Sequence, residues 1–197
     1  MARVNDGKIV IFGAGGPVGA TAIDALKNHY QLRVTDARPM REIAAGKPQS
    51  DRAPLPEVLE TPHENRQVDV TRYDQVQAAC EGMDAAINLT VVRPELAAAF
   101  AVNTVGAYNI AKAAAATGLK RLIHTGPFHL GLGHDADYAH DFDLVDDVPL
   151  RPGTDLYAMT KFLGGHIMQA FAERQGLEVI TFLYCGFRPR AVQDEER

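Results

Sequence analysis

A glycine-rich turn between a buried strand and a helix constrains this chain more than any other feature of its sequence. Residues 8–12 form a mainly apolar run, typical of a strand buried on both faces, and the glycine turn 13–19 follows directly. The spacing from Ala20 to Asn28 favours a helix, and residues 31–36 are predicted as a second strand. Strand, turn, helix and strand form one βαβ unit, which requires a parallel sheet with a right-handed crossover.

The rest of the chain continues this alternation of strands and helices. Further strands are predicted at 67–70, 84–90, 120–125 and 177–184, and helices at 40–45, 73–80, 95–116 and 156–175. The proline-rich stretch 37–66 is interpreted as a long surface connection, in which 57–60 is a candidate short strand. Gly118 and Gly176 are expected to end the two long helices. The pattern predicts an α/β fold with a doubly wound parallel sheet, in one domain over residues 1–197.

The glycines of the turn are spaced as Gly13-x-x-Gly16-x-x-Gly19. Such a turn brings backbone N–H groups and the positive end of a helix to one point, where a pyrophosphate binds. Because glycine turns also occur for purely structural reasons, the turn alone is a weak signal. Its place directly after a buried strand favours dinucleotide binding.

An acidic residue supports this interpretation. Asp36 closes the second strand 17 residues after Gly19, close to the spacing of an acid that hydrogen-bonds a ribose 2′-hydroxyl. The carboxylate would repel a 2′-phosphate, so the sequence favours NAD over NADP as cofactor. Two alternatives stay open: Asp36 as a solvated strand-end acid, and a 2′-phosphate held by Arg38 and Arg41.

Tyr157 and Lys161 place a phenol and an ammonium four residues apart, one turn along the same face of a predicted helix. A phenol with an ordinary pKa of about 10 exchanges protons readily near neutrality only if that pKa falls by roughly 3 units. An adjacent ammonium lowers it. The pair is therefore a candidate acid/base with its tuning group, and the alternative is an ordinary surface pair.

Composition excludes several other classes of protein. The chain of 197 residues is 46% hydrophobic and 23% charged, which is ordinary for a globular protein and unlike a disordered one. Its net charge of −5 comes from interspersed charges, which argues against nucleic-acid binding. No apolar run approaches the roughly 20 residues of a membrane span, and no signal peptide is recognisable. The two cysteines, Cys80 and Cys185, are expected to be buried, and the expected location is the cytoplasm.

A polar loop between residues 126 and 155 carries His134, Asp135, His140 and Asp141. These residue types bind metals, but their spacing matches no recognised ligand set. The sequence therefore predicts a polar loop over the cleft and no metal.

Several segments, in order along the chain, resemble the extended short-chain dehydrogenase/reductases, also called the NAD-dependent epimerase/dehydratase family. The matching segments are the strand and turn 9–19, the pair Asp69-Val70, the helix 103–110, the strand 120–125, the stretch 145–152 and the YxxxK motif 157–161. The resemblance implies a Rossmann-type fold with NAD as cofactor and a hydroxylated, nucleotide-sugar-like small molecule as substrate.

The resemblance also implies roles for individual residues. Tyr157 is the general acid/base, Lys161 binds the nicotinamide ribose and tunes Tyr157, and Thr125 is the nearest match to a third catalytic hydroxyl. The implied cofactor contacts are Gly13, Gly16, Pro17, Val18 and Gly19 with Asp36, then Asp69 and Val70 against the adenine, Leu89 and Thr90 beside the ribose and phosphates, Lys161, and residues 184–187 near the nicotinamide.

Two departures from the family pattern favour an alternative function without catalysis. The family's catalytic Ser or Thr lies two residues after the position of Thr125, where this chain has Pro127, and proline has neither a hydroxyl nor an N–H. Thr125 and His129 are the nearest polar candidates. The substrate-binding region beyond the last predicted strand is expected to be short or absent. The leading prediction is an NAD-dependent oxidoreductase, epimerase or dehydratase, and the alternative is a non-catalytic NAD-binding sensor or scaffold.

The resemblance implies a partner as well as a cofactor. In the family, the counterparts of helices 95–116 and 156–175 pair across a two-fold axis, so a homodimer is expected. Both helices are rich in Ala, Phe and Met. Their apolar faces have the alternative of packing on the sheet of their own chain.

Overall fold

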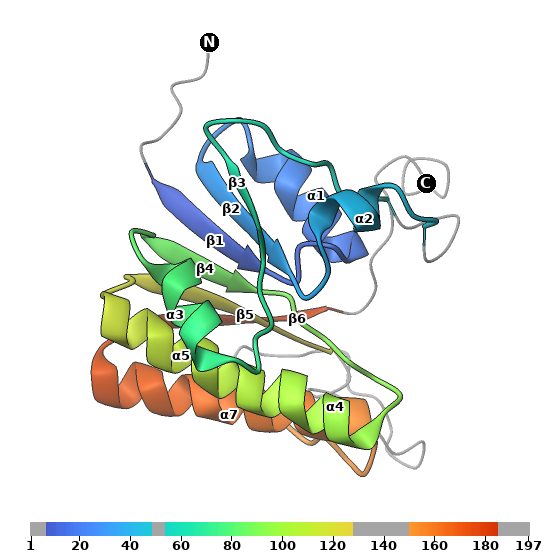
Figure 1. The fold of residues 1–197 in the computed structure, drawn as a ribbon. Coiled ribbons are helices and arrows are strands. Elements are labelled where there is room, and N and C mark those ends of the chain that lie inside the picture. Colours follow the sequence, from blue (N-terminus) through green and yellow to red (C-terminus); the bar gives the residue numbers. More distant parts are fainter. Residues whose placement is uncertain (1–6, 49–53, 128–149, 185–197) are drawn as a thin grey trace, which may run out of the picture.

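Six parallel strands form a single sheet in the order β3-β2-β1-β4-β5-β6 in the computed structural model, which describes residues 7–48, 54–127 and 150–184 (Figure 1). The strands are β1 (Lys8–Phe12), β2 (Gln31–Asp36), β3 (Glu64–Gln67), β4 (Ala85–Asn88), β5 (Arg121–Pro127) and β6 (Glu178–Tyr184). Every neighbouring pair is parallel. The predicted doubly wound parallel sheet is confirmed.

Helices cover both faces of the sheet (Figure 1). One face carries α1 (Pro17–Leu26) and α2 (Met40–Ala44). The other carries α3 (Tyr73–Cys80), α4 (Leu96–Phe100), the π-helical turn η1 (Ala101–Val105), α5 (Gly106–Thr117) and α7 (Leu156–Gln175). None of the described helices combines the length and the apolar character needed to cross a membrane.

The core has two parts, one on each face of the sheet. Successive side chains of β1 point to opposite faces, so Val10 and Phe12 join one cluster while Ile9 and Ile11 join the other. Burial on both faces explains why residues 9–12 are continuously apolar. The sheet is thus packed between helices on both of its faces.

The third strand lies at Glu64–Gln67 rather than at the predicted 67–70, and residues 57–60 form no strand. The edge strand β3 is polar, and its register is set by a long-range contact. The buried Arg33 guanidinium of β2 donates to both carboxylate oxygens of Glu64, each at 3.0 Å, and to the backbone carbonyl of Ala79 at 2.8 Å. Val68, which suggested a strand, is buried just beyond the strand end.

The predicted long helix 95–116 is divided in the structure. It begins as α4, widens into the π-helical turn η1 and continues as α5. Gly118 and Gly176 end α5 and α7 in the left-handed conformation, with φ of 73° and 67°, as expected for C-terminal caps. Helix α7 has the bounds predicted from the sequence, so Tyr157 lies in its first turn.

Candidate functional site

The chain that follows β1 runs to one face of the sheet, and the chain that follows the neighbouring strand β4 runs to the other face (Figure 1). In open α/β sheets, ligands bind in the crevice that this arrangement leaves at the carboxyl ends of the two strands. Gly13 follows β1 with a φ of 77°, in the region that favours glycine. A Cβ on Gly13 would lie 2.8 Å from the Thr90 nitrogen and 2.9 Å from the Leu89 carbonyl carbon. The structure therefore brings together Gly13, Leu89 and Thr90, which lie far apart in the sequence.

Helix α1 begins at Pro17, directly after the turn. The first helical hydrogen bond runs from the Ala20 N–H to the Gly16 carbonyl at 2.9 Å, so the N–H groups of Val18 and Gly19 precede it. A Cβ on Gly19 would overlap the Ala14 backbone oxygen, so only glycine allows the helix to approach the turn this closely. These donors at the positive helix end fit a pyrophosphate.

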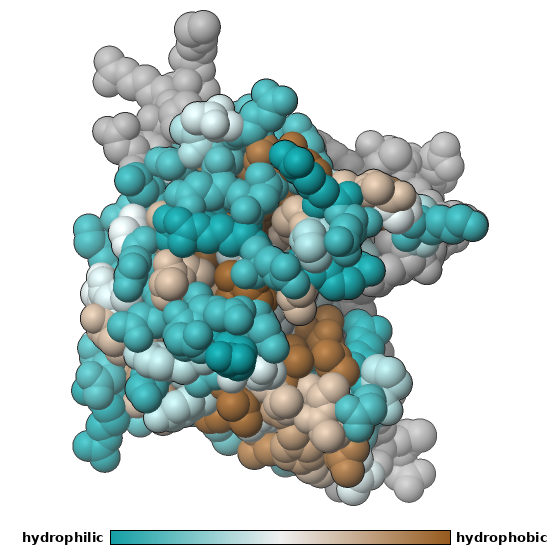
Figure 2. All heavy atoms as spheres, viewed as in Figure 1, coloured by the Kyte–Doolittle hydropathy of each residue, from teal (hydrophilic) through white to brown (hydrophobic). Residues whose placement is uncertain are grey.

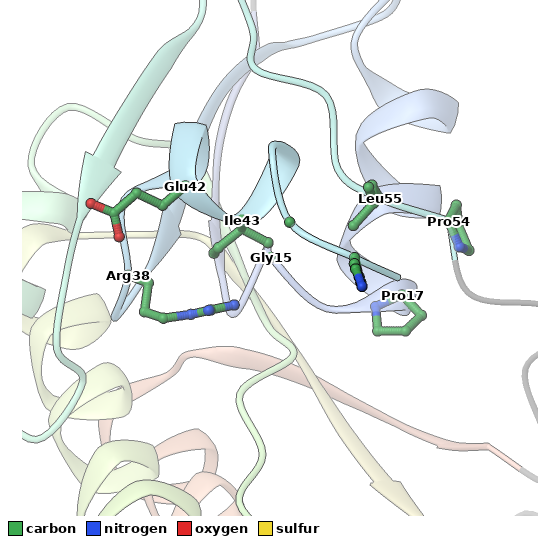
Figure 3. Close-up of a pocket in the computed structure, with 9 residues that line it drawn as sticks. Gly15, Pro17, Arg38, Glu42, Ile43, Pro54 and Leu55 are labelled. Atoms are coloured by element: carbon green, nitrogen blue, oxygen red, sulfur yellow. The ribbon is translucent and has the colours of Figure 1, made fainter. Parts of the chain in front are cut away.

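Asp36 lies against the same turn. One carboxylate oxygen accepts a hydrogen bond from the Gly15 N–H at 3.1 Å, and the other accepts from the Arg38 N–H at 3.3 Å. A cavity of about 100 Å³ opens beside this contact, lined in part by Gly15, Arg38 and Leu55 (Figure 3). The Arg38 guanidinium and the Glu42 carboxylate extend in different directions (Figure 3). The contact of Asp36 with a ribose hydroxyl stays a prediction.

Asp69 and Val70 follow β3 and make local hydrogen bonds. Asp69 accepts from the Thr71 N–H at 2.9 Å and from the Thr71 hydroxyl at 2.8 Å. The Val70 carbonyl accepts from the Asn109 side chain of α5 at 2.9 Å. Sequence reasoning missed the role of Asn109, although the segment 103–110 was singled out. Contact of Asp69 and Val70 with an adenine stays a prediction.

Lys161 is the most unusual charged residue of the site. It is 2% exposed, and burial lowers the pKa of its ammonium from 10.5 to about 7. The ammonium has three N–H donors, and among the described residues its one hydrogen bond goes to the Thr90 carbonyl at 3.3 Å. Two donors therefore remain for other acceptors. The hydroxyls of a nicotinamide ribose fit this donor set.

A buried polar pair beneath Lys161 was not predicted. The Asn88 oxygen accepts from the Thr90 N–H at 3.1 Å and from the Thr90 hydroxyl at 2.7 Å, so its nitrogen faces His124 Nδ1 at 3.2 Å. Nδ1 is then an acceptor, and the neutral imidazole carries its proton on Nε2. Burial, and then the charge of Lys161, lower the pKa of His124 well below 6.5. The available signal for these two residues was a polar side chain at the end of β4, Asn88, and another in the middle of β5, His124.

The hydroxyl of Thr125 is engaged in the sheet. It donates to the Asn88 carbonyl at 3.1 Å, and Thr125 is 8% exposed. Pro127 lies at the end of β5, in register with Tyr184 of β6. His129 and residues 185–187 lie outside the described residues. The catalytic role expected of Thr125 stays a hypothesis.

Tyr157 lies at the amino end of α7, which Asp155 caps by accepting a hydrogen bond from the Ala158 N–H at 2.8 Å. The Arg93 guanidinium carbon is 4.7 Å from the centroid of the Tyr157 ring. Arg93 belongs to the loop that follows β4, so the carboxyl ends of the strands and the start of α7 meet here. Sequence reasoning did not single out Arg93.

The polar loop with its His and Asp side chains was the candidate metal site of the sequence. Residues 134–141, which carry the His and Asp residues considered above, lie outside the described residues, as does Cys185. Within the described parts of the chain, no three His, Cys, Asp or Glu side chains are grouped to hold a metal ion. Cys80 is buried, and burial raises the pKa of its thiol to about 12.

A parallel sheet with a glycine turn at its switch point and an acid closing β2 defines a Rossmann-type dinucleotide-binding domain. The chain belongs to the NAD dependent epimerase/dehydratase family, whose model matches residues 9–187. The family resemblance found in the sequence is thereby confirmed, and NAD is the cofactor of the family.

Individual relatives agree with this assignment. The chain is 27% identical over 204 residues to the L-arabinose 1-dehydrogenase (NAD(P)(+)) of Haloferax volcanii, covering 96% of this chain and 72% of that protein. Uronate dehydrogenase from Agrobacterium tumefaciens is 22% identical with a TM-score of 0.68, covering 88% of this chain and 58% of that one. UDP-glucose 4-epimerase from Thermotoga maritima is 17% identical with a TM-score of 0.70, covering 90% and 55%. The chain spans little more than half the length of these two solved structures.

Proposed function

We propose that this protein is an NAD-dependent oxidoreductase that acts on a hydroxyl group of a sugar-like substrate. The observation that carries the proposal is the buried ammonium of Lys161, one helical turn beyond Tyr157, with donors that the described protein groups do not satisfy. A buried ammonium with so few hydrogen-bond partners lowers the stability of the folded protein, and its presence therefore favours a functional role for Lys161. The relatives named for arabinose, uronate and UDP-glucose support a sugar-like substrate.

The residues take complementary roles in this proposal. The phenolate of Tyr157 takes the proton of the substrate hydroxyl, and Lys161 holds the ribose hydroxyls and favours the phenolate by its charge. When bound, NAD accepts the hydride from the carbon that carries the hydroxyl. The N–H groups of Val18 and Gly19 hold the pyrophosphate, and Asp36 holds the adenosine ribose. Gly16 and Pro17 shape the turn around these donors.

Replacement of Tyr157 by Phe tests the proposal. The substitution removes the acid/base hydroxyl and keeps the ring, so turnover is expected to fall about 10²–10⁴-fold while NAD affinity changes little. The measurement is the absorbance of reduced nicotinamide with a panel of neutral and acidic aldoses, beside calorimetric titration with NAD. A variant as active as the parent, or a parent inactive on the whole panel, would contradict the proposal.

A second candidate function is NAD binding without catalysis. Two observations favour it: Pro127 stands where the family has a hydroxyl, and the Thr125 hydroxyl is already donated to the Asn88 carbonyl. Loss of one positioned donor at a reacting oxygen costs about 10²–10³ in rate. This candidate predicts tight NAD binding with no turnover on the same panel, so the experiment above separates the two functions.

The choice between NAD and NADP follows from Asp36. Asp36→Ala is expected to weaken NAD binding about tenfold, since it removes one charge-assisted hydrogen bond, and to improve NADP binding by removing repulsion of the 2′-phosphate. Calorimetric titration with both nucleotides checks this. A ratio of the two dissociation constants equal to that of the parent would refute the role of Asp36 at the ribose.

We also propose that the protein forms a homodimer through α4, η1, α5 and α7. The inner faces of these helices pack on the sheet of their own chain, with Ile110 and Met168 in the core. The outer surface of α4, η1 and α5 still carries exposed apolar side chains, which gather over α4 in Figure 2. The exposed residues are Leu96 (62%), Phe100 (37%), Val105 (49%) and Tyr108 (43%). Contiguous apolar patches of this kind mark protein interaction sites.

Phe100→Glu is expected to convert the dimer to a monomer, because it buries an unpaired charge in the apolar interface. Ala78→Glu places the same charge on the exposed surface of α3 and is the matched control. Sedimentation analysis of both variants checks the prediction. A parent that is monomeric at micromolar concentration, or a dimer unaffected by Phe100→Glu, would count against this interface.

A further inference from the structure

An exposed cation beside Tyr157 has no role in the function proposed so far. The Arg93 side chain is exposed, and its guanidinium carbon lies 4.7 Å from the centroid of the Tyr157 ring. No carboxylate of residues 7–48, 54–127 or 150–184 forms an ion pair with it. A guanidinium that rests on an aromatic face keeps its N–H donors, which lie in its own plane, available to a ligand.

The acid nearest to Arg93 in the sequence is committed elsewhere. The two carboxylate oxygens of Glu95 accept hydrogen bonds from the backbone N–H groups of Ala97 at 2.9 Å and Ala98 at 2.6 Å, which caps α4. These bonds lower the pKa of Glu95, so the carboxylate stays ionised and remains a helix cap. The charge of Arg93 is therefore not neutralised by its sequence neighbour.

The backbone on both sides of Arg93 is held in place. The buried Asn103 side chain accepts from the Val92 N–H at 3.0 Å and donates to the Val92 carbonyl at 2.7 Å. The same Asn103 amide donates to the Thr160 hydroxyl at 2.9 Å and so joins this loop to α7. Pro94 follows Arg93 and restricts the backbone there. The guanidinium is thus pre-organised relative to Tyr157.

We propose that Arg93 binds an anionic group of the substrate and that the protein prefers acidic sugars. This inference rests on the proposed function, since it places the reacting hydroxyl at Tyr157. A sugar whose hydroxyl meets the Tyr157 phenol lies beside this guanidinium, because the guanidinium carbon is 4.7 Å from the centroid of the Tyr157 ring. The planar fork of Arg matches a carboxylate or a phosphate with two parallel hydrogen bonds. Arg93 is then a specificity-determining residue, and the ligand chemistry is an oxyanion on the sugar.

The test compares binding of three probes to the NAD-saturated protein by calorimetry: D-glucuronate, D-glucose 6-phosphate and D-glucose. We expect at least one acidic probe to bind tenfold or more tightly than glucose, and added salt to weaken this preference. Arg93→Gln should abolish the preference, while Arg93→Lys, which keeps the charge and loses the fork, should retain part of it. The tighter of the two acidic probes identifies carboxylate or phosphate as the source of the oxyanion.

Arg121→Gln is the matched control, because Arg121 is an exposed arginine at the amino end of β5, the opposite edge of the sheet. It should leave the preference unchanged. Equal binding of acidic and neutral probes, undetectable binding of both acidic probes, or a preference that survives Arg93→Gln would overturn the proposal. Failure of the proposed function gives a different result, namely acidic probes that bind in an Arg93-dependent way without reduction of NAD.

Discussion

Lys161→Met is expected to stabilise the protein while sharply lowering its turnover. The ammonium is 2% exposed and has one acceptor among the described residues, the Thr90 carbonyl at 3.3 Å. Methionine keeps much of the apolar stem and removes the buried charge. Turnover should fall about 10²–10⁴-fold, because the substitution removes the group that we propose to hold the ribose and to favour the Tyr157 phenolate.

The gain in stability should depend on pH in a defined direction. The pKa of Lys161 is about 7 in the folded protein and 10.5 as an ordinary value, so the unfolded chain binds more protons between these values. The destabilisation by Lys161 is fully present below about pH 7 and disappears as the pH rises toward 10.5. At 1.36 kcal/mol per pKa unit, its upper limit is on the order of 5 kcal/mol.

Urea unfolding of the parent and of Lys161→Met between pH 6 and pH 10 measures this difference. Lys120→Met, which changes an exposed lysine before β5, is the control and should show no such pH dependence. NAD is expected to stabilise the parent more than Lys161→Met, because ribose hydroxyls supply acceptors for the ammonium. A variant that is less stable than the parent at pH 7 would show that Lys161 is better satisfied than its contacts indicate.

The elements that sequence reasoning predicted well are those whose own residues specify them. Residues 8–12 are apolar because β1 is buried on both faces, and residues 73–80 and 156–175 are helices with the predicted bounds. The third strand was misplaced because its register depends on a pair distant in sequence, Arg33 and Glu64. Local apolarity instead favoured the segment around Val68, which is buried without being part of a strand.

The residues of the site also divide into those that local sequence predicted and those that it missed. The glycine turn and Asp36 were singled out from their spacing in the sequence, and in the structure Asp36 accepts a hydrogen bond from the Gly15 N–H of that turn. The supporting groups Asn88 and His124 were missed because each looks like an isolated polar residue until β4 and β5 pair. The π-helical turn was missed for the same reason: its Asn103 joins the loop at Val92 to Thr160 of α7, and no local pattern predicts either contact.

Two adjacent glycines of α7 are expected to respond in opposite directions to substitution by alanine. A Cβ on Gly164 would overlap the backbone oxygen of Asn103 and lie 3.3 Å from the Ala107 Cβ, whereas a Cβ on Gly165 meets no atom within 4 Å. Gly165→Ala should stabilise the protein by about 0.5–1 kcal/mol, the usual gain in a helix. Gly164→Ala should destabilise it by about 1–3 kcal/mol, because backbone cannot move aside as a flexible side chain does.

Gly164→Ala should also displace Lys161 and so lower the turnover. To admit a methyl group at Gly164, α7 must move away from η1, and Lys161 lies one turn earlier on that helix. Misplacement of about 1 Å can cost up to about 10² in rate, so turnover of Gly164→Ala should fall far more than that of Gly165→Ala. Urea unfolding and NAD reduction, measured for both variants, check this. Equal stability and equal turnover of the two variants would show that the contact between Gly164 and Asn103 does not position Lys161.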